Sequence, residues 1–224
     1  YQKNMIETIH KDRFVIAKLP RQSGKSTTVI SYLLHYVLFN SSKNVAILAN
    51  KQVTARELLG RLKLAYEHLP KWLQQGVIEW NKGSIHLENG SKILASSTSS
   101  SAVRGGSFNM LFLDEFAFVP ENVADEFFSS VYPTISAGQE TKVLIISTPK
   151  GLNMYYKLWN DAIEKRNSYT PIDVHWTEVP GRDEKWKKET IRNTSPEQFR
   201  AEFECEFLGS LNTLIAPSKL KTLV

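Results

Sequence analysis

Cysteine is nearly absent from this chain, since Cys205 is the one cysteine among 224 residues. A single cysteine excludes an internal disulfide and any metal site built from several cysteines, and it suits a reducing cytoplasm. The five histidines are scattered along the sequence without the spacing of metal ligands. The sequence therefore gives no support to a disulfide scaffold or to a histidine and cysteine zinc site.

Long apolar runs are also missing. The longest runs have the length of single strands, which is too short to span a membrane, and the N-terminus carries no signal peptide. The chain begins at Tyr1 rather than methionine, so we expect a fragment of a longer protein. The net charge of +5 permits a polyanionic partner but is too small to require one. With 42% hydrophobic residues, the chain can bury a full core.

Strand-like apolar runs alternate with helical patterns over residues 1–165. The alternation predicts an α/β protein with a mostly parallel central sheet flanked by helices. Strands are expected at 13–18, 45–48, 110–113, 143–146 and 172–176, with a hairpin over 84–96 that turns through Asn89-Gly90. Helices are expected at 3–10, 25–39, 53–68, 152–165, 183–193 and 195–207. A change of character near 177–180 predicts a core over 1–178 and a small second part over 179–224.

The motif that carries most of the chemical information lacks one glycine. Residues 20–26 read PRQSGKS, directly after an apolar run at 14–17 and before a helical stripe, which is the layout of a phosphate-binding loop. Backbone N–H groups at the helix start would face a polyphosphate, Lys25 would reach its outer phosphates, and the Ser26 hydroxyl would ligate Mg²⁺. The usual pattern has a glycine five residues before Gly24, where this chain has Leu19.

Two carboxylates, Asp114 and Glu115, follow the apolar run at 110–113. They would emerge at the C-terminal end of a buried strand, where open α/β sheets bind ligands. Asp114 would hold Mg²⁺ through water, and Glu115 would orient and deprotonate the water that attacks the γ-phosphate. The alternative is that both acids cap the next helix. The phosphate-binding loop upstream favours the nucleotide role, and the adjacent acidic pair favours hydrolysis over a nucleotide kinase.

Three further positions are candidates for contact with the γ-phosphate. Residues 147–149 read STP and end the strand 143–146, which we expect beside the loop strand, so a hydroxyl there would sense the γ-phosphate. Alternatively, the proline merely ends the strand. Arg21 inside the loop could stabilise transition-state charge in cis, and Arg104 could do so from a neighbouring subunit. The alternative for each arginine is pairing with a surface carboxylate.

Several of these runs resemble a known family. KLPRQSGKS at 18–26, LDEFAF at 113–118 and STP at 147–149 resemble the ATPase motor domain of the large terminase subunit, the DNA-packaging enzyme of tailed bacteriophages and herpesviruses, and most closely that of the T-even phage group. Similar runs at 79–85, 102–105 and 198–200 extend the resemblance over essentially the whole chain. In that family the missing glycine and the arginine in the loop are regular features.

The resemblance implies a P-loop NTPase fold with a small, lid-like C-terminal part, and it implies a role for each matching residue. Glu115 is the catalytic carboxylate, Arg21 acts on the γ-phosphate, and Arg104 is a finger acting in trans. The implied metal ligands are Ser26 and Asp114. The implied nucleotide contacts are Gln22, Ser23, Gly24, Lys25, Ser26, Thr27, Thr148 in the motif that couples hydrolysis to movement, and Tyr1 with Gln2 in an adenine-recognition motif.

The same resemblance implies ATP and Mg²⁺ as cofactors and ATP hydrolysis that drives double-stranded DNA into a viral procapsid. The implied partners are DNA, the portal protein, the small terminase subunit and further copies of the chain in a homo-oligomeric ring, acting in the host cell cytoplasm and not at a membrane. Because the chain stops before the family's nuclease domain could fit, we expect no DNA cleavage. A helicase-like translocase and a nucleotide-switched binding module without turnover are the alternatives. The charged run 182–192 fits a solvated amphipathic helix better than a DNA-tracking surface.

Overall fold

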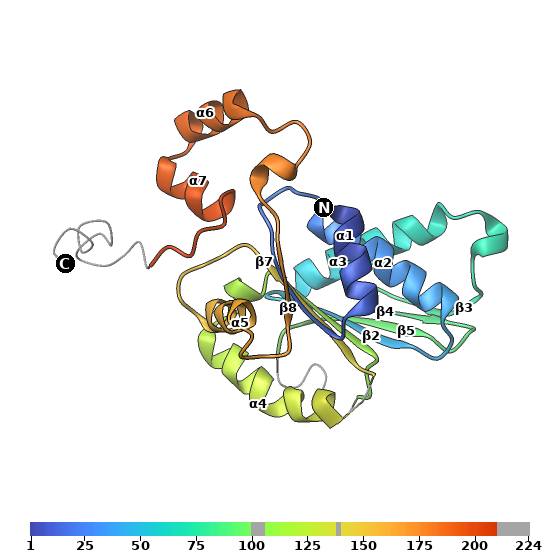
Figure 1. The fold of residues 1–224 in the computed structure, drawn as a ribbon. Helices are drawn as coiled ribbons and strands as arrows, with labels where there is room; N and C mark the ends of the chain where they lie inside the picture. Colours follow the sequence, from blue (N-terminus) through green and yellow to red (C-terminus); the bar gives the residue numbers. More distant parts are fainter. Residues whose placement is uncertain (100–105, 138–139, 210–224) are drawn as a thin grey trace.

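The computed structural model describes residues 1–99, 106–137 and 140–209. An eight-stranded sheet with the strand order β3-β4-β5-β2-β6-β7-β1-β8 lies at its centre (Figure 1). The strands are β1 (Phe14–Lys18), β2 (Asn44–Ala49), β3 (Val77–Trp80), β4 (Ser84–Leu87), β5 (Lys92–Ser97), β6 (Met110–Asp114), β7 (Lys142–Ser147) and β8 (Thr170–Asp173). The helices are α1 (Gln2–Lys11), α2 (Lys25–Phe39), α3 (Gln52–Glu67), α4 (Glu121–Ala137), α5 (Met154–Ile163), α6 (Glu184–Asn193) and α7 (Pro196–Glu202), with 3-10 turns η1 (Lys71–Leu73), η2 (Phe116–Phe118) and η3 (Trp176–Glu178).

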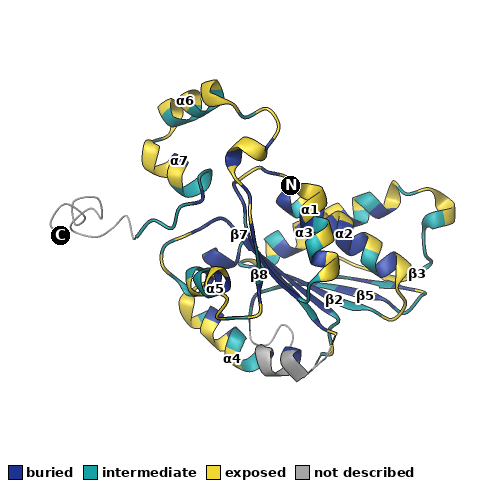
Figure 2. Ribbon diagram, viewed as in Figure 1, coloured by how far each residue is buried: buried dark blue, intermediate teal, exposed yellow. Residues whose placement is uncertain are grey.

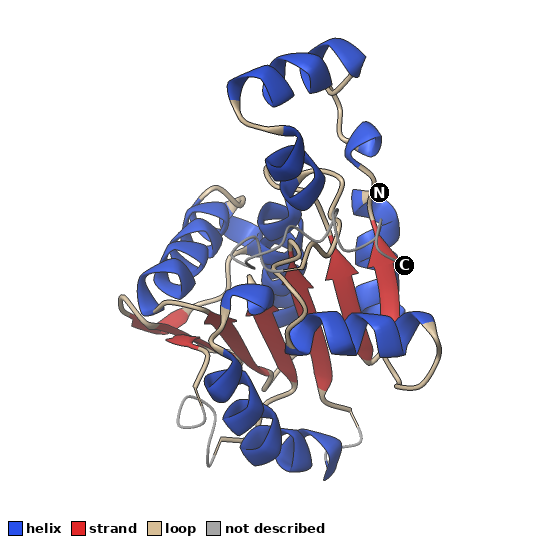
Figure 3. Ribbon diagram, turned by 90° about the vertical axis from the view of Figure 1, so that its left-hand side faces the viewer, coloured by secondary structure: helices blue, strands red, loops and turns tan. Residues whose placement is uncertain are grey.

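The neighbouring strands from β5 through β8 in this order are all parallel, whereas β4 runs antiparallel to both of its neighbours, β3 and β5, at one edge. This arrangement confirms the predicted α/β class with a mostly parallel sheet. β7 pairs with β1 on one side and with β6 on the other. The expected neighbourhood of the loop strand and the strand that ends in Ser147 is therefore confirmed. In side view the parallel strands point toward the edge above which α6 and α7 lie (Figure 3).

Helices cover the sheet on both faces, with α1, α2 and α3 on one side and α4 and α5 on the other (Figure 2). Successive side chains of a strand point to opposite faces, so the fully apolar runs of β1 and β6 supply both cores. In β6, Phe112 packs in the first core, while Leu111 and Leu113 pack in the second. Burial on both faces explains why these strands read as continuous apolar runs rather than as alternating ones.

The predicted hairpin strands are present, but the prediction of a two-residue turn through Asn89-Gly90 is wrong. The register pairs His86 with Lys92, which leaves a longer connection, and Gly90 N–H donates to Leu87 O at 3.0 Å. Gly90 adopts φ +82°, whereas Asn89 stays out of the left-handed region that the two-residue turn requires of both residues. The Asn89 amide donates instead to Val37 O at 2.8 Å, which ties the turn to α2.

Four other elements differ from the prediction. The helix expected over 195–207 ends at Glu202, and Cys205 adopts φ +54°, which a helix cannot continue through. The strand expected at 172–176 is β8, displaced toward the N-terminus; it contains Pro171, which is tolerated because β8 lies at the sheet edge and pairs only with β1. β3 and α4 lie in segments to which the sequence patterns assigned no element.

The segment with α6 and α7 lies at the C-terminal edge of the strands (Figure 1) and packs through aromatic rings. The Trp186 ring lies 5.9 Å from that of Trp176 and 5.1 Å from that of Phe203, and Phe199 lies 5.7 Å from Trp176. Trp176 precedes the proposed boundary at residue 178, so the contact joins the two predicted parts; the division itself stays a prediction. Among the helices of the described residues, none is long and apolar enough to cross a membrane.

Candidate active site

The loop between β1 and α2 turns at two residues in the left-handed region, Gln22 with φ +53° and Gly24 with φ +76°. The backbone conformation of Gly24 favours glycine, and a Cβ there would lie 2.9 Å from the Gln2 side-chain nitrogen, so that side chain would have to shift. The Ser23 hydroxyl braces the loop by donating to Pro20 O at 2.8 Å. α2 begins at Lys25, and the first N–H groups of a helix have no partner within it, which makes this end suitable for an anion.

Leu19 explains the missing glycine of the loop motif. Its side chain is fully buried in the core that α1 and α2 cover, and its N–H donates to Ser147 O at 3.3 Å. The chain therefore leaves β1 while still packed in the core, and it begins its turn only after Pro20. The position that is usually glycine serves here as an anchor for the start of the loop.

Two cavities meet at this loop and share Gln22, Ser23 and Gly24. The first, of about 310 Å³, is lined by Arg21, Gln22, Ser23, Gly24, Lys25, Ser26, Thr27, Arg61 and Glu115. The second, of about 500 Å³, is lined by Tyr1, Gln2, Lys3, Gln22, Ser23, Gly24, Glu178, Val179 and Pro180. The structure thus brings the predicted phosphate contacts to one side of the loop and the predicted adenine contacts to the other. Arg61 and residues 178–180 are additions that the sequence motifs do not indicate.

Lys25 and Glu115 form an ion pair inside the first cavity, with 3.1 Å between Nζ and Oε1. The Lys25 side chain is only 7% exposed, so the pair is poorly screened by solvent. Glu115 sits directly after β6 with φ +53°, an uncommon conformation for a residue with a side chain. The strand end and this backbone turn together aim the carboxylate at the loop lysine.

Asp114 lies beside the first turn of α2. The Ser26 hydroxyl donates to Asp114 Oδ2 at 3.4 Å, and the residue is 3% exposed. Burial raises the pKa of the Asp114 carboxyl to about 6; the charge of Glu115 adds to the rise, while Lys25 and the Ser26 hydrogen bond oppose it. Among the described residues, its Oδ1 is buried without a hydrogen-bond partner. An unsatisfied carboxylate oxygen beside a hydroxyl is the kind of oxygen donor set that Mg²⁺ prefers, so the residues present fit this ion.

Arg21 lines the cavity, but its polar groups are engaged by the C-terminal part of the chain. Its guanidinium forms an ion pair with Glu202, and its N–H donates to Glu202 O at 3.0 Å. Its carbonyl accepts from Arg182 Nη2 at 2.6 Å. The pairing with a carboxylate is the alternative that the sequence left open for an isolated arginine. Arg104, the other arginine candidate, lies outside the described residues.

The STP run packs against the turn that follows Glu115. Ser147 Oγ accepts from the Ala117 N–H at 3.1 Å, and the Asn153 amide donates to Ala117 O at 2.7 Å. The β7–α5 connection therefore pins η2 at both of the backbone groups of Ala117. Asn153 also caps α5 by accepting from Tyr156 N–H at 3.3 Å, and an asparagine before a helical stripe is a signal that a sequence can give.

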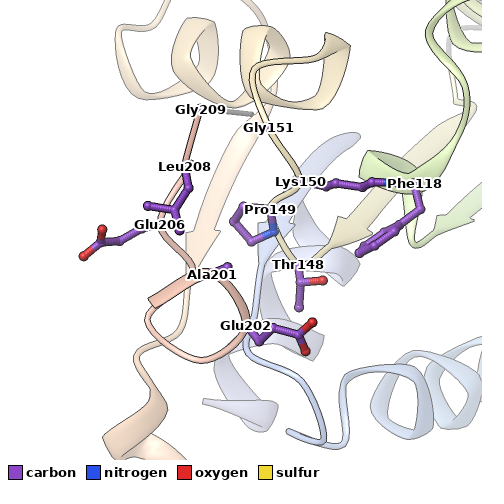
Figure 4. Close-up of a pocket in the computed structure, with 10 residues that line it drawn as sticks. All are labelled: Phe118, Thr148, Pro149, Lys150, Gly151, Ala201, Glu202, Glu206, Leu208 and Gly209. Atoms are coloured by element: carbon purple, nitrogen blue, oxygen red, sulfur yellow. The ribbon is translucent and has the colours of Figure 1, made fainter. Parts of the chain in front are cut away.

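Thr148 lines neither of the two cavities at the loop. It is buried beside a third cavity of about 370 Å³, which lies between the STP run and the C-terminal segment. Figure 4 shows the Glu202 side chain close to Thr148, and the Lys150 side chain extending toward Phe118. The cavity places the STP run next to the carboxylate that holds Arg21.

The chain matches a described protein family over nearly its whole length. The profile of the family "Terminase large subunit, T4likevirus-type, N-terminal" matches residues 16–222. Among curated proteins, the large terminase subunits of Thermus phage G20c and of Thermus virus P23-45 are each 25% identical to it over 90% of this chain. The match covers 47% of each relative, so the chain spans about half the length of these proteins.

Solved structures share the fold. The large terminase ATPase domain of Thermus phage P74-26 superposes with a TM-score of 0.72 at 22% identity, covering 91% of this chain and 92% of that one. The HK97 bacteriophage large terminase gives 0.77 at 17% identity, covering 98% of this chain and 53% of that one. The large terminase of a thermophilic bacteriophage, solved in complex with ATP-γ-S, gives 0.69 at 12% identity, covering 92% and 52%.

At these identities the solved structures establish the fold, whereas the family profile establishes descent because it covers far more than half of the chain. The family is the one that the loop, strand-end and STP runs of the sequence resembled. The chain belongs to the T4-like family of terminase large subunits, of which it represents the N-terminal domain.

Proposed function

We propose that this chain is a Mg²⁺-dependent ATPase domain that converts ATP hydrolysis into the movement of double-stranded DNA into a viral procapsid. The observation that carries the proposal is the convergence of Lys25, Ser26 and Glu115 in one cavity, with Asp114 bound to Ser26 beside it. Membership in the terminase large-subunit family supports it. The structures of a thermophilic bacteriophage's large terminase with ADP and with ATP-γ-S support an adenine nucleotide.

The nucleotide would lie across the loop. Its phosphates would occupy the cavity at Lys25, where the loop N–H groups and the start of α2 favour anions. Its base would occupy the neighbouring cavity, where the amide of Gln2 approaches Gly24. Mg²⁺, held by Ser26 and through water by Asp114, would neutralise charge on the terminal phosphates.

Glu115 would act as the general base for the attacking water. Its partner Lys25 is a cation that the γ-phosphate oxygens also attract, so a bound triphosphate would draw the lysine away from the carboxylate. Glu115 would then be free to accept a proton from water held near the γ-phosphate. The hydrogen bonds that Ser147 and Asn153 make to Ala117 would keep the Glu115 turn in place.

Arg21 would link hydrolysis to movement. In this proposal Arg21 leaves Glu202 to contact the γ-phosphate, so the nucleotide and the last turn of α7 would compete for one guanidinium. Two hydrogen bonds of the Arg21 main chain, its N–H to Glu202 O and its carbonyl from the Arg182 side chain, would pass any shift of the loop to the C-terminal segment. We further propose that the domain works in a homo-oligomeric ring with DNA, the portal protein and the small terminase subunit, in the host cytoplasm, and that Arg104 serves a neighbouring copy.

The direct test is steady-state phosphate release from ATP by the chain with Mg²⁺, with and without double-stranded DNA. We expect turnover that depends on Mg²⁺ and increases with protein concentration, because an arginine from a neighbour would be supplied only on association. Tight ATP binding with no turnover under any of these conditions would contradict the proposal and identify a nucleotide-switched binding module. Separation of a DNA duplex into strands would instead favour a helicase-like translocase.

A further inference from the structure

Three cations line the phosphate cavity, and two of them already have acidic partners. Lys25 pairs with Glu115 at 3.1 Å, and Arg21 pairs with Glu202. The third cation is Arg61 of α3, which is exposed and for which no ion pair or hydrogen bond exists among the described residues. Arg61 is therefore the one described arginine or lysine of this cavity whose charge is not already satisfied.

The packing of α3 explains how Arg61 reaches the cavity. α3 lies beside α2 and buries one stripe against it and the sheet, formed by Ala55, Leu58, Leu59, Leu62 and Tyr66. Arg61 stands at the border of this stripe, next to Leu62, so its side chain emerges where α3 borders the first turn of α2. Ser26 and Thr27 of that turn line the same cavity as Arg61.

The position of Arg61 indicates which end of the proposed nucleotide it would contact, the phosphates or the base. Arg61 lines the cavity that contains Glu115, and it is absent from the lining of the cavity at Tyr1 and Gln2. Glu115 must face the γ-phosphate if it activates water, so Arg61 shares the end where the terminal phosphate would lie. A terminal phosphate carries a charge of about −1.5 to −2 at neutral pH, and a planar guanidinium can bind two of its oxygens at once.

We propose that Arg61 is a further nucleotide-binding residue of this domain, which contacts the terminal phosphate of the nucleoside triphosphate from α3. The inference rests on the proposed ATPase function. It assigns the phosphate site a cation supplied in cis by a helix outside the loop and strand-end motifs. Because Arg61 needs no release from a carboxylate, it can bind the triphosphate before Arg21 leaves Glu202.

The test is calorimetric titration of ATP-γ-S and of ADP, both with Mg²⁺, into the unaltered chain and into the Arg61→Gln and Arg56→Gln variants. Arg56 is a matched control because it is exposed on the same helix, lines neither cavity, and lies about 140° around the axis from Arg61. Glutamine and arginine have similar helix propensities, so both variants should keep the thermal midpoint of the unaltered chain.

We expect Arg61→Gln to weaken ATP-γ-S binding about tenfold and ADP binding less than about twofold, and Arg56→Gln to change neither. Equal weakening of both nucleotides, no weakening, or the same loss in Arg56→Gln would overturn the assignment of Arg61. Failure of the unaltered chain to bind either nucleotide would instead overturn the proposed function, and this inference with it. A Lys25→Ala variant, which should lose both nucleotides, shows that the titration reports the phosphate site.

Discussion

Arg21 and Glu202 form an ion pair that joins the phosphate-binding loop to the last turn of α7. The same two residues are joined a second time by the main-chain hydrogen bond from Arg21 N–H to Glu202 O, at 3.0 Å. The loop arginine is thus held by a carboxylate of the C-terminal segment. A substitution at Glu202 separates the side-chain contact from the main-chain contact.

Glu202→Gln should strengthen the binding of ATP-γ-S. The substitution removes the charge that competes for Arg21 while it leaves the main-chain bond in place. Both side chains are partly exposed, at 48% and 26%, and pairs of this kind are worth about 0.2–1 kcal/mol. The expected gain is therefore at most about fivefold in affinity, measured by calorimetric titration. Glu206→Gln, which breaks the exposed pair with Arg200, is the control and should leave affinity unchanged. Weaker binding in Glu202→Gln would show that Glu202 and the γ-phosphate do not compete for the Arg21 guanidinium.

Glu115→Gln should preserve nucleotide binding and abolish turnover. Glutamine fits the same space but cannot accept the proton of the attacking water, and loss of a general base costs about 10²–10⁴ in rate. Lys25 would also lose its anionic partner, so ATP affinity should stay the same or rise. The measurements are phosphate release and nucleotide titration. Glu121→Gln, at the exposed start of α4, is the matched control. Hydrolysis at the rate of the unaltered chain would remove Glu115 from the mechanism.

Mixing of two inactive variants tests the assignment of Arg104 to a neighbouring copy. Arg104→Ala subunits keep Glu115, and Glu115→Gln subunits keep Arg104, so a mixed ring would contain complete sites at some of its interfaces. We expect phosphate release to reappear when the two are mixed at concentrations that allow association. Absence of recovery in demonstrably mixed assemblies would count against the assignment of Arg104 to a neighbouring copy.

The strand-end part of the site could be predicted from the sequence because each of its motifs is local. A buried strand shows as an apolar run, and the residues that follow it must appear at the edge of the sheet, as Asp114 and Glu115 do. Lys25 and Ser26 follow from the loop pattern in the same way. The meeting of these groups required only that β1, β7 and β6 be neighbours, which a parallel sheet made natural.

The contacts between distant segments could not be predicted, because no local pattern encodes them. Glu202 and Arg182 approach Arg21 across more than 160 positions of chain, and Arg61 reaches the cavity only because α3 packs beside α2. α4 was missed for a different reason: Pro133 interrupts its helical pattern, although the backbone continues as helix to Ala137. The prediction of the hairpin turn failed because the Asn89 side chain donates a hydrogen bond to Val37 O of α2, a contact outside the hairpin itself.

Asn153→Asp should slow turnover while it leaves nucleotide affinity nearly unchanged. Aspartate caps a helix as well as asparagine does, so α5 keeps its cap. The carboxylate cannot donate to Ala117 O, so the turn that positions Glu115 loses one of its two supports. We expect kcat to fall about tenfold and KM to change less than about twofold, as for loss of positioning rather than of binding. Asp183→Asn, the reverse exchange at the cap of α6, should change neither constant. An unchanged kcat in Asn153→Asp would show that the bond to Ala117 O does not position Glu115 for turnover.

Gly24→Ala should abolish nucleotide binding at a modest cost in stability. Gly24 has φ +76°, where a Cβ costs roughly 1–2 kcal/mol, and the new methyl group would lie 2.9 Å from the Gln2 nitrogen. Relief of that contact must move either the loop or Gln2, and these form the boundary between the phosphate cavity and the base cavity. Gly151→Ala separates the two effects, because Gly151 has φ +65° but its Cβ would meet nothing within 4 Å, and it lines neither cavity. Thermal unfolding should therefore show similar losses for both variants, whereas titration with ATP-γ-S should show lost affinity only for Gly24→Ala. Unchanged affinity in Gly24→Ala would mean that the nucleotide does not lie across this glycine.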